Sequence, residues 1–159
     1  MAEAPFDVKR AHRWFAVELN NLAWELIEAP QRDDAQIEQM INAAHGACFH
    51  WAQVGDILNQ LRGEQLLASA YVTAILPVSA VRHAKRAVTL LKQVGDKATP
   101  FDVACTHGCA GAAFALAGED PQAKDHLVAL RDAVDKLEHE GEKKVIRNLY
   151  FDGLVAKYD

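Results

Sequence analysis

The sequence predicts an all-α fold of about seven helices, arranged as stacked antiparallel hairpins with a C-terminal capping helix. Helical periodicity of apolar residues runs nearly from end to end, and no segment shows convincing two-residue alternation. The connections between helices are mostly short, so successive helices are expected to lie antiparallel and side by side. In addition, one pattern of small and aromatic residues occurs twice, 43 residues apart.

This repeated pattern combines residues from two successive helices. A small residue stands three positions before an aromatic residue on one helix, and an alanine follows nine positions later at the start of the next. The two copies comprise Leu67, Ala68, Tyr71, Ala80 and Ala87, and then Ala110, Gly111, Phe114, Ala123 and Leu130. Such spacing is typical of helix hairpins that pack closely and stack on their neighbours.

The first hairpin is bounded by residues that stop and start helices. A helix is predicted over 6–28, and Pro30 ends it. Asp33 or Asp34 is placed to cap the second helix, because a carboxylate accepts hydrogen bonds from the first free amides. Gly55 ends that second helix.

The second hairpin begins at Asp56, another predicted N-terminal cap. Its first helix is expected to run to about Ile75. Pro77 suits the first turn of the next helix, because proline lacks the amide hydrogen that this turn leaves unpaired. That helix continues to Val94.

The third hairpin shows the clearest start signals. Thr99-Pro100-Phe101-Asp102 combines a cap, a proline at the first helical position and an acid in the first turn. This helix ends at Gly118, and Asp120-Pro121 starts its partner. Gly141 separates this partner helix from a seventh helix. The seventh helix is expected to cover the apolar face left open at the end of the stack.

Composition limits the classes of function. The chain has 159 residues, which suits a single domain over 1–159, and a formal net charge of −5, which argues against nucleic acid as the main ligand. No apolar run approaches about 18 residues, so we expect no membrane-spanning segment. Three cysteines and no secretory signal favour a reducing cytoplasm.

The third hairpin resembles a tetratricopeptide repeat. Gly111 and Phe114 occupy the places of its small and aromatic residues, Gly118 that of its turn and Ala123 that of its second-helix alanine. The second hairpin matches similarly, but Ile75 stands where a turn glycine is usual. The spacing of 43 residues exceeds the consensus of about 34, so these units are lengthened and degenerate.

Four short segments also resemble an uncharacterised bacterial family of this general type. They are Ala43-Ala44-His45, His50-Trp51, Val54-Gly55 and Arg62-Gly63-Glu64. The resemblance runs from Trp24 to about Leu130 and implies a helical-repeat protein of unassigned role.

In proteins that resemble this one, the first helix of each hairpin lines a concave face. If this arrangement holds here, a groove is formed by Arg62, Gln65, Ser69 and Thr73 on one helix and by Cys105, Gly108 and Ala112 on the next. Such a groove suits a peptide or a partner helix. We therefore expect a non-enzymatic protein-binding scaffold without a cofactor. For Arg62 there is a second interpretation, bidentate pairing with a carboxylate on an adjacent helix.

A metal- or small-ligand-binding protein, an enzyme included, is the alternative function. His45 with Cys48, or Cys105 with Cys109, would supply the ligands. Cys105 and Cys109 lie about 40° apart on one helix face, but no motif provides two further ligands. Their small neighbours also favour close approach of another helix, and His45 favours a hydrogen bond across a helix interface. No motif for nucleophilic catalysis, phosphate or dinucleotide binding is present.

Self-association is a third possibility. Short helical stacks leave apolar ends, which a second copy of the chain can cover. The sequence does not determine whether Trp14, Trp24 and Tyr150 are covered by the chain itself or by such a copy.

Overall fold

The structure is a computed structural model that describes residues 4–159, and within this range it contains helices and no strand. The prediction of an all-α fold is confirmed. Six helices come first: α1 (Val8–Glu28), α2 (Asp34–Val54), α3 (Ile57–Thr73), α4 (Pro77–Val94), α5 (Pro100–Leu116) and α6 (Asp120–Asp135). The C-terminal helix is continuous and comprises α7 (Glu140–Ile146), the π-helical turn η2 (Arg147–Phe151) and α8 (Asp152–Tyr158). A short 3₁₀ turn, η1 (Gly95–Lys97), follows α4.

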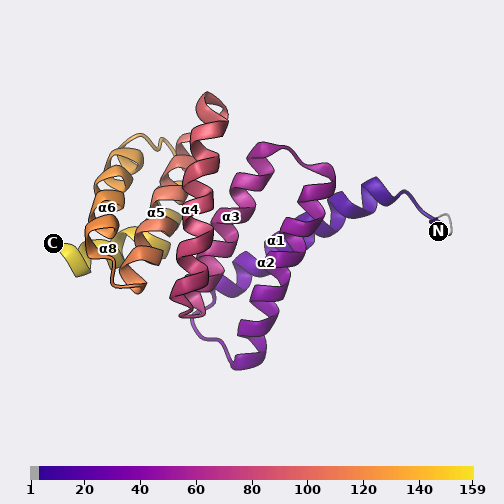
Figure 1. Ribbon diagram of the computed structural model, residues 1–159, viewed down its shortest axis with the longest axis horizontal. Helices are drawn as coiled ribbons and strands as arrows, with labels where there is room; N and C mark the ends of the chain where they lie inside the picture. The colour runs from indigo at the N-terminus through magenta and orange to yellow at the C-terminus, as the bar shows by residue number, and fades with distance from the viewer. Residues whose placement is uncertain (1–3) are drawn as a thin grey trace.

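The helices pack in adjacent pairs, as predicted. The hairpins are α1 with α2, α3 with α4, and α5 with α6, and each neighbours the next (Figure 1). The second helices α2, α4 and α6 begin at residues 34, 77 and 120, which are separated by equal intervals. The first helices are also in contact, α1 with α3 and α3 with α5, so they form one face of the stack.

The predicted caps bound these helices. Asp33 accepts a hydrogen bond from the amide of Gln36 and caps α2, which decides between the two candidate aspartates. Asp56 caps α3 in the same manner. Thr99 caps α5, and the Asp102 side chain accepts in return from the Thr99 amide. Each cap pairs amides that the first helical turn leaves free, so short local sequences determine where these helices begin.

The turns that end α3 and α5 have the same geometry. The amide of Leu76 donates to the Tyr71 carbonyl at 2.9 Å, and the amide of Glu119 donates to the Phe114 carbonyl at 2.9 Å. Both turns need one residue with a left-handed backbone. Gly118 supplies it in the second turn at φ 75°, and Ile75 adopts it in the first at φ 60°. The turn therefore forms at Ile75 even though glycine, the residue that favours this backbone conformation, is absent there.

The C-terminal helix lies across the first helices. It packs on α5 and α6, as a capping helix should, and it also reaches α3 through Tyr150 and the α1–α3 core through Leu149. Ile146, Tyr150 and Leu154 are all buried and repeat every four residues, so they form the apolar stripe of this helix.

Two glycines of α5 make this close packing possible. A Cβ at Gly108 would overlap the ring of Tyr150, and a Cβ at Gly111 would lie 2.8 Å from a methyl carbon of Leu154. The run of small residues on α5 thus admits a neighbouring helix, as its sequence favoured. Among residues 4–159, no helix has both the length and the apolar character that a bilayer span requires.

Candidate functional site

The predicted groove is filled by the C-terminal helix along part of its length. The hydroxyl oxygens of Ser69 and Tyr150 lie 2.6 Å apart, and Gly108 lies against the Tyr150 ring. Thr73 and Ala112 are half-buried. The sequence left undetermined whether this groove is open or filled, and the structure shows that the C-terminal helix fills part of it. Ser69 and Gly108 hold the C-terminal helix and present no free surface to a partner.

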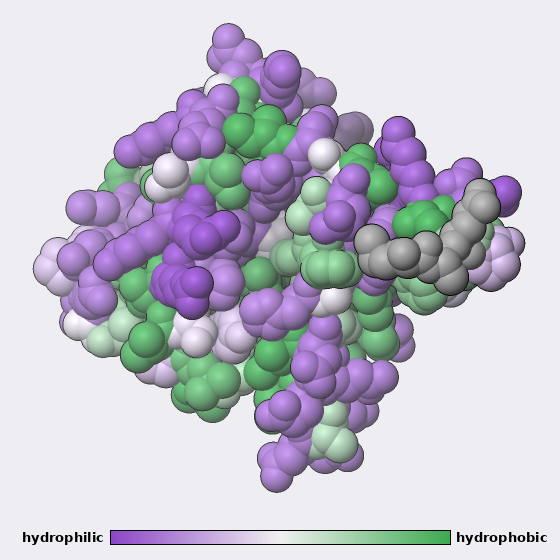
Figure 2. Space-filling view, turned by 45° about the vertical axis from the view of Figure 1, so that its right-hand side comes forward, coloured by the Kyte–Doolittle hydropathy of each residue, from purple (hydrophilic) through white to green (hydrophobic). Residues whose placement is uncertain are grey.

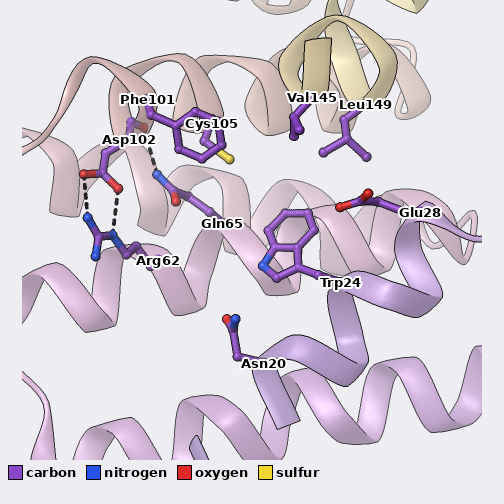
Figure 3. A pocket seen from close by; sticks show the side chains of 10 residues that line it. All are labelled: Asn20, Trp24, Glu28, Arg62, Gln65, Phe101, Asp102, Cys105, Val145 and Leu149. Atoms are coloured by element: carbon purple, nitrogen blue, oxygen red, sulfur yellow. Dashed lines mark hydrogen bonds and ion pairs between the residues drawn. The ribbon is translucent and has the colours of Figure 1, made fainter. Parts of the chain in front are cut away.

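The part of the groove that stays open is a pocket of about 350 Å³ (Figure 3). It lies where α1, α3, α5 and the C-terminal helix meet, and we call it the Trp24 pocket. Its lining residues are Asn20, Trp24, Glu28, Arg62, Gln65, Phe101, Asp102, Cys105, Val145 and Leu149. Three predicted groove residues, Arg62, Gln65 and Cys105, are therefore brought together here.

A bidentate ion pair forms one wall. Arg62 donates from Nε to Asp102 Oδ1 at 2.8 Å and from Nη2 to Oδ2 at 3.1 Å. This pairing is the second interpretation of Arg62, and it is confirmed. Asp102 is 2% exposed, whereas the Arg62 side chain is 47% exposed. The guanidinium therefore covers a buried carboxylate and keeps its other edge toward solvent.

The hydrogen bonds of Asp102 stabilise its charge. Burial by itself would raise the pKa of this carboxyl group, but hydrogen bonds from Arg62 and Thr99 outweigh burial and lower the pKa. The hydrogen bond to Asp102 likewise raises the pKa of Arg62. Both groups are thus charged at neutral pH and compensate each other.

Gln65 supplies a buried polar group beside this pair. Its Nε2 donates to the Asp102 carbonyl at 2.9 Å and to Thr106 Oγ1 at 2.8 Å. Its Oε1 accepts no hydrogen bond from any residue within 4–159, yet this atom is not sealed from solvent. Because Gln65 is 3% exposed and lines the pocket, the free acceptor faces the pocket.

Apolar side chains complete the lining. Trp24 comes from α1, Phe101 from α5, and Val145 and Leu149 from the C-terminal helix (Figure 3). Burial raises the pKa of the Cys105 thiol to about 12, so it is protonated at neutral pH and behaves as a small apolar group. The site thus combines a hydrophobic interior with a few oriented polar groups, as ligand pockets commonly do.

The residues of the metal alternative are dispersed. His45 Nε2 lies 2.7 Å from the Tyr71 hydroxyl, the expected bond across a helix interface, and this contact is confirmed. Burial raises the pKa of Cys48 to about 12 and that of Cys109 well above its usual value. Within residues 4–159, no three His, Cys, Asp or Glu side chains are grouped to hold a metal ion.

Four of the remaining histidines form two separate pairs, and His83 lies 2.7 Å from a carboxylate oxygen of Glu64. Nδ1 atoms lie 2.8 Å apart in the pair His12 and His50, and 3.0 Å apart in the pair His107 and His126. Neither pair lines the Trp24 pocket. His45 and His83 do lie together, with ring centroids 5.9 Å apart and Glu64 beside His83, but these three residues line none of the main pockets of the described part of the chain.

The sequence reasoning missed Trp24, Phe101 and Asp102 as pocket residues. The sequence pattern identifies Asp102 as the first-turn acid of its helix, and nothing local indicates that its carboxylate also pairs with Arg62, 40 residues away. The two aromatic residues resemble ordinary core positions in a helical pattern. Their place in a pocket depends on how the C-terminal helix crosses α5.

Comparisons with protein-family models, with curated proteins and with solved structures each found no match. The fold and the site by themselves thus define the class: an all-α protein of paired helices, with a pocket on the face made by its first helices.

Proposed function

We propose that this protein is a non-enzymatic, tetratricopeptide-repeat-like module that binds a protein or peptide segment at the Trp24 pocket. The observation that carries the proposal is the position of this pocket. It continues the face of α1, α3 and α5 on which the protein's own C-terminal helix is already docked. A second polypeptide segment bound here would contact the same face in the way that the C-terminal helix already does.

The docked C-terminal helix illustrates that mode. It inserts Ile146, Tyr150 and Leu154 at four-residue intervals, as amphipathic helices do in grooves. Tyr150 adds a polar contact with Ser69. The inner face of the stack is therefore suited to receiving apolar anchors, with single polar groups determining their orientation.

The size of the pocket restricts what it accepts. A volume of about 350 Å³ lies at the lower end of the range for ligand pockets. It suits one anchor side chain with its flanking backbone and not a whole helix. The exposed edge of Arg62 and the free oxygen of Gln65 are a donor and an acceptor for that backbone.

Selection from a random displayed-peptide library tests this function. Peptides selected on the wild-type protein are expected to lose at least tenfold in affinity for Trp24→Ala, which removes the aromatic wall. Trp14→Ala is the matched control, because Trp14 lies on the same helix, is 58% exposed and does not line the pocket. Equal loss in both variants, or in neither, would reject the pocket as the binding site.

Self-association is a second candidate, favoured by a separate observation. Phe6, Trp14, Phe15 and Phe49 are exposed by 44–62% around the start of α1 and the end of α2. Figure 2 shows hydrophobic side chains at the surface on its right-hand side, where α1 begins. Light scattering tests it: a dimer that becomes a monomer in Phe49→Glu supports this interface, and a wild-type monomer at about 100 μM excludes it as a stable one.

A further inference from the structure

We infer that the Trp24 pocket selects a cationic anchor, the ammonium group of a lysine side chain with or without methyl groups. This inference rests on the proposed peptide-binding function and names the chemistry of the residue that enters. It is argued from the charge of the lining, the faces of its two aromatic rings and its free hydrogen-bond acceptors.

The charges of the lining leave one carboxylate uncompensated. Arg62 and Asp102 neutralise each other through their bidentate pair. Glu28 also lines the pocket, and it forms no ion pair within residues 4–159. Lys144 borders the adjoining hollow together with Glu28, but the two form no ion pair among the described residues. The lining residues therefore carry one uncompensated formal negative charge, on the exposed side chain of Glu28.

Two aromatic rings line the pocket, and no cation of the described chain covers either of them. Trp24 and Phe101 line the pocket, and Figure 3 shows the Glu28 side chain extending toward the Trp24 ring. Elsewhere the protein places its own cations over rings, such as Lys85 over Phe114 at 5.7 Å. No described lysine or arginine lies over Trp24 or Phe101 in this way. An ammonium group between Trp24 and the Glu28 carboxylate would be attracted both by the π face of the ring and by the opposite charge.

The polar atoms of the lining also match a donor. The free Oε1 of Gln65 is a nearly buried acceptor that faces the pocket, and Asn20 contributes a second amide oxygen. An ammonium group carries three donors and no acceptor, so it fits such a lining. Arg62 keeps its outer edge free to donate to the carbonyl of the bound backbone.

An anionic anchor fits these groups less well. It could reach the outer edge of Arg62, but Asp102 already compensates that charge and the anion would lie close to Glu28. A neutral aliphatic anchor would bury the apolar wall and leave the nearly buried amide oxygen of Gln65 without a partner, which costs free energy.

Titration of the wild-type chain with capped amino acids tests the inference. The probes are N-acetyl-lysine methylamide, its trimethyl derivative, and a neutral analogue in which carbon replaces the trimethylated nitrogen. Binding is followed by NMR through the indole N–H signal of Trp24. The cationic trimethyl probe should bind about 2- to 30-fold more tightly than its neutral analogue, the range expected of cation–π contacts.

Two variants locate the effect. Glu28→Gln should reduce affinity for the cationic probes several-fold and leave the neutral analogue unchanged. Glu25→Gln is the matched control, because Glu25 is exposed on the same helix and does not line the pocket. Equal binding of the charged and neutral probes, or no effect of Glu28→Gln, would overturn the inference.

The outcomes also separate this inference from the proposed function. If selected peptides bind in a Trp24-dependent manner but carry apolar or acidic anchors, the peptide-binding function stands and the cationic anchor is rejected. If neither peptides nor probes perturb Trp24, both are rejected.

Discussion

The imidazole ring of His83 lies flat on the phenol ring of Tyr71, with centroids 5.4 Å apart and 5° between the planes. The same arrangement recurs 43 residues later, where His126 lies on Phe114 with centroids 5.5 Å apart and 7° between the planes. The repeat read from the sequence thus includes a stacked pair on each hairpin. The two hairpins differ in what faces the histidine: Glu64 lies 2.7 Å from His83, whereas His107 lies 3.0 Å from His126.

The His107–His126 pair predicts that acid destabilises the fold. Burial and the nearby His126 lower the pKa of His107 to about 4, and burial lowers that of His126. In the unfolded chain a histidine titrates near pH ~6.5, so below that pH the unfolded state binds more protons. The stability that this pair contributes is full above pH ~6.5 and is lost as the pH falls toward 4.

Urea unfolding at pH 7.5, 6 and 5 measures this dependence. His107→Gln should lose less stability between the first and last pH than the wild type does. His139→Gln, at an exposed position, is the control and should follow the wild type. Identical pH dependence in His107→Gln and the wild type would contradict the role of this pair.

Ile75→Gly is expected to stabilise the protein. Ile75 holds a left-handed backbone that disfavours a β-branched residue by about 1–2 kcal/mol, and its side chain is 71% exposed. Glycine relieves this strain but adds about 0.5–1 kcal/mol of backbone entropy to the unfolded state. The net gain should be about 0.5–1 kcal/mol in urea unfolding. Gly118→Ala, at the equivalent turn, should destabilise the protein. If Ile75→Gly is less stable than the wild type, the argument is refuted.

Gly108→Ala should loosen the C-terminal helix. The added methyl group would overlap the Tyr150 ring, and overpacking of this kind costs about 1–3 kcal/mol. Limited proteolysis should cut the variant sooner within 140–158 than it cuts the wild type. Gly153→Ala is the comparison on that helix. A Cβ added at Gly153 would meet no neighbouring side chain within 4 Å, so alanine should stabilise the protein by about 0.5–1 kcal/mol. Similar effects of the two substitutions would argue against the close contact.

Arg62→Ala should destabilise the protein by about 1–3 kcal/mol, because it leaves the buried carboxylate of Asp102 without its main partner. The cost stays below that of a fully buried pair because half of the Arg62 side chain is in water. Lys143→Ala removes an exposed pair with Glu140 and should change stability by less than about 0.5 kcal/mol. Thermal or urea unfolding measures the stability of both variants. If Arg62→Ala leaves the free energy of unfolding unchanged, the interpretation of this ion pair is contradicted.

The helices, their caps and their pairing could be predicted because the interactions that determine them are local. Asp56 caps a helix through amides two and three residues away, and an apolar stripe at helical spacing identifies the buried face of each helix. The alignment with Gly118 located the turn at Ile75, but it did not predict the left-handed backbone that Ile75 adopts there. Amino-acid order within a few turns carries all of this information.

Tertiary structure alone decided how the C-terminal helix crosses the face made by α1, α3 and α5, and where a pocket remains on that face. Tyr150 meets Ser69 across 81 residues of sequence, and Arg62 meets Asp102 across 40. Helix phase shows that a side chain points inward, but it contains no information on which neighbour it meets. That choice depends on how closely two glycines let the C-terminal helix approach α5. This crossing fills part of the predicted groove and forms one wall of the Trp24 pocket.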